Sequence, residues 1–203
     1  QFSITSDATA PTVAITSGAT DPVSGAFTAT FTFSEDVTGF ALDDITAGNG
    51  SASAFTTTSS AVYTALITPA ADGVVTIDVA AGAAQDSAGN NNLAATQFSI
   101  TSDATAPTVA ITSGATDPVS GAFTITVTFS EDVKGFEIGD ITVTNGAADS
   151  FNTTSASIYT ALITPAADGV VAVDVAAAAA QDSAGNDNLA ATQFSITSDA
   201  TAP

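Results

Sequence analysis

FTATFTF, residues 27–33, alternates apolar and hydroxylated side chains without a break. The four apolar residues share one face and the three threonines share the other, a period of two that is typical of a β-strand with one buried side. The same reading predicts strands near residues 12–17, 40–48, 52–57, 61–68, 74–80 and 94–101. Turn signals such as Asp21-Pro22, Asn49-Gly50 and Asp72-Gly73 separate them. Seven strands in about 96 residues predict a β-sandwich.

One stretch has the composition of a helix. Residues 80–84 are rich in alanine, as are residues 176–180 further along the chain. Alanine has the highest helix propensity, and the stretch is short, so we expect a single helical turn there.

An internal repeat sets the domain organisation. QFSITSDATAPTVAITSGATDPVSGAFT begins at Gln1 and again at Gln97, and QFSITSDATAP returns at Gln193, so the period is 96 residues in both cases. A period of this length suits a small self-contained domain rather than a solenoid unit. We expect repeats at 7–102 and 103–198, a last-strand remnant of a preceding repeat at 1–6, and the start of the next linker at 199–203. The chain therefore reads as a piece of a longer array.

The charge balance excludes several classes of function. The 203 residues include 21 acidic side chains, one basic side chain (Lys134) and no histidine or cysteine, for a formal net charge of −20. The usual general bases, nucleophiles and phosphate-binding groups are therefore missing, and we expect no enzyme. A polyanion would be repelled, so neither nucleic acid nor an anionic membrane is an expected partner. With 45% hydrophobic residues and no apolar run long enough to span a bilayer, the chain should fold without membrane insertion.

Two further sequence features could suggest other functions. Thr28, Thr30 and Thr32 form a flat threonine array, as in ice-binding surfaces, but any exposed strand face uses such residues. Paired carboxylates such as Asp43 and Asp44 could suggest glycoside hydrolysis. Neighbouring residues on a strand point apart, and the chain has no tryptophan to stack against a sugar, which disfavours that activity.

Four segments resemble one known family. They are SDATAPTV (6–13), FSEDVTGF (33–40), YTALITPAADG (63–73) and AAQDSAGNNN (83–92), and the resemblance to bacterial immunoglobulin-like domains extends over both copies. It implies an all-β protein of two tandem immunoglobulin-like sandwiches, end to end, with about seven strands each. Such domains are similar to those in the extender regions of giant surface adhesins, including the repeats-in-toxin type. In those arrays calcium at the domain junctions adds stiffness, and the location is extracellular, on the bacterial cell surface.

Immunoglobulin connectivity gathers carboxylates at the ends of each sandwich. The chain enters at what we term the upstream end, where the loops after the second and sixth strands also lie; the opposite end is the downstream end. Crowded carboxylates without basic partners either stay protonated or recruit a cation. Calcium fits the second option, because it accepts six to eight oxygen ligands in irregular geometry. The absence of histidine and cysteine argues against zinc, copper or iron. The expected ligands are Asp7, Glu35, Asp44, Asp86 and Asn90 in the first copy and Asp103, Glu131, Asp140, Asp182 and Asn186 in the second, with Asp21 and Asp72 as weaker junction candidates.

The simpler reading of the 86–92 loop is that its polar side chains cap local backbone groups. It is no EF-hand, because the bidentate glutamate at the twelfth position is missing. Asp72-Gly73 is first of all a turn.

Together these features predict a structural extender, with neighbouring repeats of the same chain as its partners and a monomeric fragment. The alternative is a ligand-binding module, in which the surface at 41–62 and 137–158 recognises a sugar or protein and the repeats supply avidity. These two segments hold most of the differences between the copies, which mildly opposes a repeated ligand site. An accessory domain of a secreted hydrolase is the third possibility.

Overall fold

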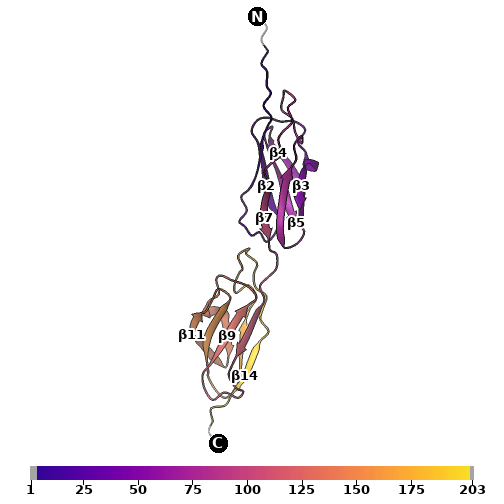
Figure 1. Ribbon diagram of the computed structural model, residues 1–203. Helices are drawn as coiled ribbons and strands as arrows, with labels where there is room; N and C mark the ends of the chain where they lie inside the picture. Colours follow the sequence, from indigo (N-terminus) through magenta and orange to yellow (C-terminus); the bar gives the residue numbers. More distant parts are fainter. Residues whose placement is uncertain (1–3, 202–203) are drawn as a thin grey trace. The chain divides into compact units, whose positions relative to one another are not determined.

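The computed structural model describes residues 4–201. It divides into two compact units, Gln1–Ala104 and Thr105–Pro203, each of which is described by itself. Figure 1 colours the first unit from indigo to magenta and the second from rose through orange to yellow. The expected last-strand remnant at 1–6 falls partly on residues 1–3, outside the described residues, and residues 4–6 form no strand. The expected linker start at 199–203 likewise includes residues 202 and 203, which lie outside them.

The first unit is a sandwich of two antiparallel sheets. One sheet has the order β1-β2-β5-β4 and the other the order β3-β6-β7, which is the arrangement of an immunoglobulin constant-type domain. The elements are β1 (Val13–Ser17), β2 (Phe27–Phe33), the 3-10 turn η1 (Leu42–Asp44), β3 (Ile45–Gly48), β4 (Gly50–Ser59), β5 (Val62–Pro69), β6 (Gly73–Val79) and β7 (Phe98–Ser102).

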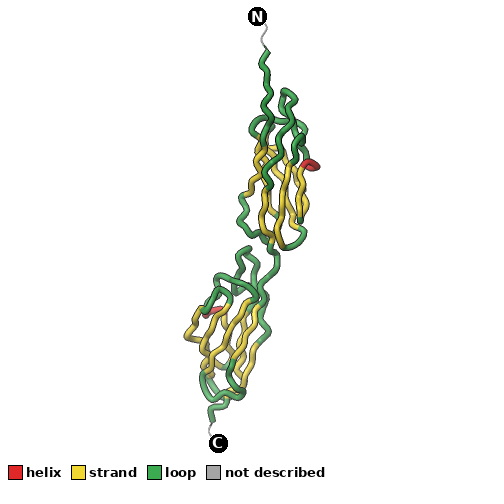
Figure 2. The backbone as a smooth tube through the Cα atoms, viewed as in Figure 1, coloured by secondary structure: helices red, strands yellow, loops and turns green. Residues whose placement is uncertain are grey.

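The second unit repeats this topology. Its sheets have the orders β11-β12-β9-β8 and β10-β13-β14. The elements are β8 (Val109–Ser113), β9 (Phe123–Phe129), η2 (Ile138–Asp140), β10 (Ile141–Thr144), β11 (Gly146–Thr153), β12 (Ile158–Pro165), β13 (Gly169–Val175) and β14 (Phe194–Ser198). Figure 2 shows strands making up the body of each unit, with loops gathered at its two ends. The expected all-β fold of two immunoglobulin-like sandwiches is confirmed.

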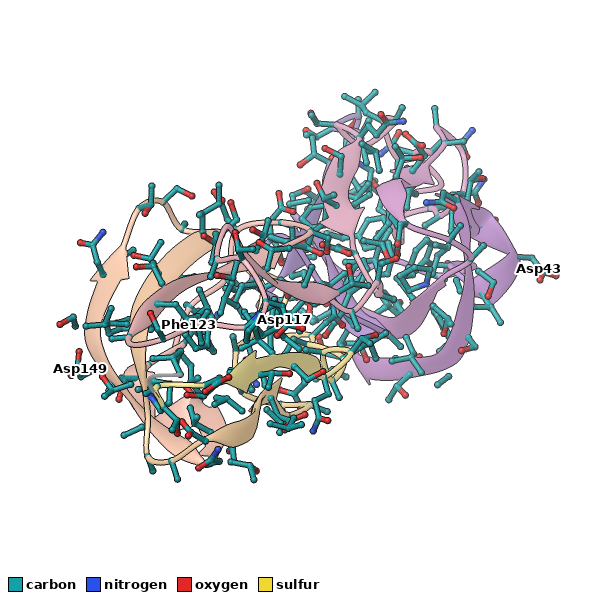
Figure 3. The ribbon with its side chains drawn as sticks, turned by 90° about the horizontal axis from the view of Figure 1, so that it is seen from below. Asp43, Asp117, Phe123 and Asp149 are labelled. Carbon is teal, nitrogen blue, oxygen red and sulfur yellow. The ribbon has the colours of Figure 1, made fainter. Side chains whose placement is uncertain are left out.

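The FTATFTF segment forms β2 and supplies much of the core. Phe31 is fully buried and lies opposite Tyr63 of β5, while Val13 of β1 lies opposite Phe33. Burial alternates along the strand with the period of the sequence. Phe27, at the start of β2, is also buried, and its equivalent in the second unit is the buried Phe123 of β9, which Figure 3 shows among the strands. The apolar face of this strand therefore holds the two sheets together.

The loop after β2 is fastened to the sandwich by a tyrosine. The Tyr63 hydroxyl donates to the Val37 carbonyl at 3.2 Å and lies 3.1 Å from the Ser60 carbonyl. Thr38 and Gln85 then exchange backbone hydrogen bonds, Thr38 N to Gln85 O at 2.8 Å and Gln85 N to Thr38 O at 3.0 Å. The loops after β2 and β6 are thus joined at the upstream end of the unit.

The helical turn expected at 80–84, and at 176–180, is wrong. Residues 81 and 82 form a hydrogen-bonded turn, and the described helical residues are those of η1 and η2. Gly82 has a φ of 79° and its equivalent Ala178 a φ of 58°, a left-handed conformation that ends any right-handed helix. The strand expected at 40–48 begins only at Ile45, because η1 occupies the residues before it. No helix within residues 4–201 has the length and apolar character that a membrane span requires.

Candidate metal centre

Three carboxylates meet at the upstream end of the first unit. Asp7 precedes β1, Glu35 lies in the loop after β2, and Asp86 lies in the loop after β6. One ligand atom from each lies within 4.8 Å of the others. The topology explains the meeting, since both loops return to the end at which the chain enters. The group expected from the connectivity, Asp7 with Glu35 and Asp86, is thus assembled from three separate segments.

Asp86 is the buried member of the group. It is 4% exposed, and its Oδ1 accepts hydrogen bonds from the backbone N–H groups of Ala88 and Asn90, each at 2.8 Å. Its Oδ2 accepts from the Asn90 side chain at 2.7 Å. These bonds, with the side-chain bond from Asn90 first among them, hold the pKa of the Asp86 carboxyl below its usual range. Asp86 therefore remains a carboxylate although it is buried.

Asn90 links this loop to the incoming chain. Besides its bond to Asp86, the Asn90 Nδ2 donates to the Asp7 backbone carbonyl at 3.2 Å. In this arrangement Asn90 supplies donors to its neighbours, and its amide nitrogen faces the carboxylate. The residue expected as a ligand is at the site, where it acts as a hydrogen-bond donor.

The pKa of Glu35 is raised by its surroundings in this group. Burial raises its pKa above the usual value, and the negative charges of Asp7 and Asp86 raise it further. Residues 1–133 contain no lysine, arginine or histidine, so no basic side chain of the first unit can offset these charges. The group as it stands favours either a proton on Glu35 or a bound cation.

The donor set fits calcium. All three side chains offer oxygen, the ligand atom that calcium takes, and oxygens within 4.8 Å of one another can share an ion at about 2.4 Å from each. Calcium also accepts backbone carbonyls and waters, which would complete a shell of six to eight oxygens around these residues. The chain holds no histidine or cysteine to favour a softer metal.

The second repeat carries the same residue types 96 residues later. Glu131 follows β9 and Asp182 follows β13, as Glu35 follows β2 and Asp86 follows β6, and Asp182 is 1% exposed. Asp103 takes the sequence position of Asp7 and lies in the first unit, directly after β7. Asn186 repeats the role of Asn90, since its backbone N and its Nδ2 donate to the Asp182 carboxylate at 2.9 and 2.8 Å.

Two of the expected ligands lie outside these groups. The Asp44 Oδ2 accepts a hydrogen bond from the Ala41 backbone N–H at 2.8 Å, and the Asp140 Oδ2 accepts from Glu137 N at 2.8 Å. Each therefore closes the 3-10 turn that contains it, η1 or η2. The sequence alternation there predicted a strand start and gave no sign of the turn.

The weaker candidates Asp21 and Asp72 lie at the downstream end of the first unit. The Asp21 Oδ1 accepts from Thr101 N at 2.9 Å, and the Asp72 Oδ1 accepts from Ala104 N at 2.7 Å. Both contact the chain as it leaves β7.

Asn92 binds local backbone groups with its side chain, as the simpler interpretation of the 86–92 loop predicts. It is 1% exposed, its Oδ1 accepts from Ala84 N at 2.8 Å, and its Nδ2 donates to the Ala80 carbonyl at 3.0 Å. Asn92 thereby braces the loop that presents Asp86, and Asn188 does so in the second unit. The asparagine stands six residues after the aspartate in both copies.

A family model described as bacterial Ig-like domain matches residues 7–101 and again residues 103–198. The chain belongs to the bacterial Ig-like domain family. A search among curated proteins finds no sequence match to this bacterial Ig-like chain.

The solved structures to which this bacterial Ig-like chain is similar include three bacterial proteins. InvD of Yersinia pseudotuberculosis is 18% identical over 93% of this chain and 57% of its own, with a TM-score of 0.37. Invasin, described as a bacterial integrin-binding protein, is 15% identical over 92% of this chain and 39% of its own, with a TM-score of 0.45. The N-terminal part of the S-layer protein SbsC is 16% identical over 95% and 45%, with a TM-score of 0.34. This chain spans less than two thirds of the length of each.

Proposed function

We propose that this bacterial Ig-like chain is a spacer segment of a bacterial surface adhesin, and that calcium bound at the upstream end of each repeat stiffens the array. In this role the protein acts outside the cell and provides distance between the cell and the adhesive part of the parent protein. Two gapless copies of 96 residues support a role in length, because repetition extends a chain without adding a new site.

One observation carries the calcium part of the proposal. In the group of Asp7, Glu35 and Asp86, one carboxylate precedes the first strand and the other two come from loops of the sandwich. An ion shared by the three would tie the incoming linker to the body of the domain. Asp103 repeats the position of Asp7, directly after β7 in the sequence, so every linker would carry one ligand.

The energetics follow from the charges. Without a cation, the three carboxylates repel one another and oppose docking of the linker. A divalent ion removes that repulsion, and because the unfolded chain lacks the assembled group, binding also stabilises the folded state by mass action. The chain has no cysteine, so calcium would take the part that disulfides play in many extracellular domains.

Thermal unfolding and small-angle scattering of the 203-residue chain, with calcium and with chelator, test the proposal. We expect calcium to raise the Tm and the maximum dimension. If chelation leaves both unchanged, the stiffening role is wrong. Specific binding on a glycan or protein array would instead favour the ligand-binding module.

A matched pair of variants separates site binding from general charge screening. The site variant neutralises the first group through Asp7→Asn, Glu35→Gln and Asp86→Asn. The control variant removes the same charge from three exposed acids, through Asp43→Asn, Glu137→Gln and Asp149→Asn. Figure 3 shows Asp43 and Asp149 pointing away from the strands. We expect the calcium response of the first repeat to disappear in the site variant and to persist in the control.

A further inference from the structure

The chain leaving each sandwich is held by loop carboxylates at the downstream end. In the first unit, the Asp72 Oδ1 accepts from Ala104 N at 2.7 Å, and the Asp21 Oδ1 accepts from Thr101 N at 2.9 Å. Between them, Asp103 N donates to the Val23 carbonyl at 2.9 Å and Val23 N donates to the Thr101 carbonyl at 2.9 Å. These hydrogen bonds hold the backbone of residues 101–104 against the loops of the sandwich.

The second unit repeats these contacts. The Asp168 Oδ1 accepts from Ala200 N at 2.7 Å, and the Asp117 Oδ1 accepts from Thr197 N at 2.9 Å. Asp199 N donates to the Val119 carbonyl at 2.8 Å. The Thr201 hydroxyl adds a bond to the Asp168 Oδ2. The backbone bond from Ala200, and then the Thr201 bond, lower the pKa of Asp168, so its charged form is the one that accepts.

A braced turn presents the carboxylate of this contact. Asp168 precedes Gly169, whose φ of 125° is one that glycine adopts without strain. The Asn145 side chain holds the turn by donating to the Ala167 carbonyl at 3.0 Å, and Asn49 holds the Asp72 turn through Ala71 at 3.0 Å. The position of Asp168 is therefore set by the turn within the sandwich and does not depend on its contact with residues 200 and 201.

We propose that Asp72 with Asp21, and Asp168 with Asp117, form a downstream clamp that fixes the direction in which the chain leaves each sandwich without any cation. The inference goes beyond the proposed calcium role and does not depend on it. A linker would then have two kinds of attachment, a protein clamp at its beginning and a cation-dependent one after it. The first linker residues move with the preceding sandwich in either state, so calcium would act only on the remainder of the linker.

Ala200 offers a direct test in a polypeptide of these 203 residues, because its N–H is the donor to the Asp168 carboxylate. Its amide hydrogen exchange and ¹⁵N relaxation are measured by NMR in the presence of chelator. A hydrogen bond to a charged acceptor should slow exchange about tenfold. We expect this protection in the wild-type chain, its loss in Asp168→Ala, and its retention in Asp149→Ala, which removes an exposed acid of the same unit.

Thr201→Val provides a milder variant, since it removes only the hydroxyl donor and leaves the sandwich untouched. We expect it to increase the mobility of residue 201 while Ala200 stays protected. Free-chain exchange of Ala200 in the wild-type protein with chelator would overturn the clamp, as would protection that survives Asp168→Ala. Since every measurement is made without calcium, failure of the clamp and failure of the calcium proposal are distinguishable.

Discussion

Asn90 directs its amide nitrogen at Asp86, with Nδ2 lying 2.7 Å from the carboxylate Oδ2. The same nitrogen contacts the Asp7 carbonyl, so one side chain joins the loop after β6 to the incoming chain. The loop is therefore held together by its own hydrogen bonds, which also keep the buried Asp86 carboxylate charged.

Asn90→Ala should weaken this arrangement. Loss of the side-chain donor raises the pKa of Asp86 toward its usual value and removes one charge-assisted bond, so we expect the Tm in chelator to fall by about 4 to 8 °C. Because the folded-state pKa of Asp86 is lowered, its stabilisation is present above the unfolded value and is lost as pH falls through the folded value. The pH at which the protein loses stability on acidification, followed by circular dichroism between about pH 5 and pH 2, should therefore be higher in the variant.

Asn91→Ala is the control for that variant. Asn91 lies in the same loop at an exposed position, and its Oδ1 accepts a hydrogen bond from the Gln85 side chain at 2.8 Å rather than contacting Asp86. If the loss of stability at low pH shifts equally in both variants, the part assigned to Asn90 is contradicted.

The effect of Glu35→Gln on the Tm should have opposite signs in chelator and in calcium. The raised pKa of Glu35 means that its charged form is disfavoured in the folded state, so its contribution is full below the unfolded pKa and is lost as pH rises through the folded one. At neutral pH in chelator, the neutral glutamine should therefore raise the Tm. In calcium the same variant should show a lower Tm than the wild type, because a ligand is missing. Calorimetry in the two buffers measures both; a loss of stability in chelator would contradict the explanation.

A single backbone position should make one repeat more stable than the other. Gly82 and Ala178 occupy equivalent positions with φ of 79° and 58°, and each donates its N–H to an asparagine carbonyl at 3.0 Å. Alanine is strained in this region, so Ala178→Gly should stabilise the second repeat by about 1 kcal/mol and Gly82→Ala should destabilise the first by a similar amount. Denaturant unfolding of the whole chain measures the two transitions. Shifts of the same sign in the two variants would rule out the backbone account.

The sequence predicts the upstream group because its members depend on topology alone. Once FTATFTF is assigned to the second strand, the loops holding Glu35 and Asp86 must return to the end at which Asp7 enters. Asp44 and the alanine-rich stretch depend on local conformations that alternation does not encode. Asp44 closes a 3-10 turn, and the left-handed residue at position 82 prevents a helix. The sequence pattern also does not predict the contact that Asp72 makes. Asp-Gly indicates a turn, but it gives no information on the Ala104 N–H that donates to the Asp72 carboxylate.

Lys134, the one basic side chain, should make the two carboxylate groups unequal in calcium affinity. It stands where the first repeat has Thr38, and both residues exchange backbone hydrogen bonds with the glutamine that precedes the loop aspartate. Lys134 also lines a pocket of about 190 Å³ together with Asp132 and Asp182. A positive charge about 8 Å from a divalent ion in a water-like dielectric opposes binding by about 1 kcal/mol. Lys134→Thr should thus tighten calcium binding by the second group about fivefold, and Thr38→Lys should weaken the first by a similar factor.

Calorimetric titration at low and high salt measures both affinities. The difference between them should be smaller at high salt, because salt screens the charge of the lysine. Identical affinities before and after the exchange would show that residue 134 does not affect the ion.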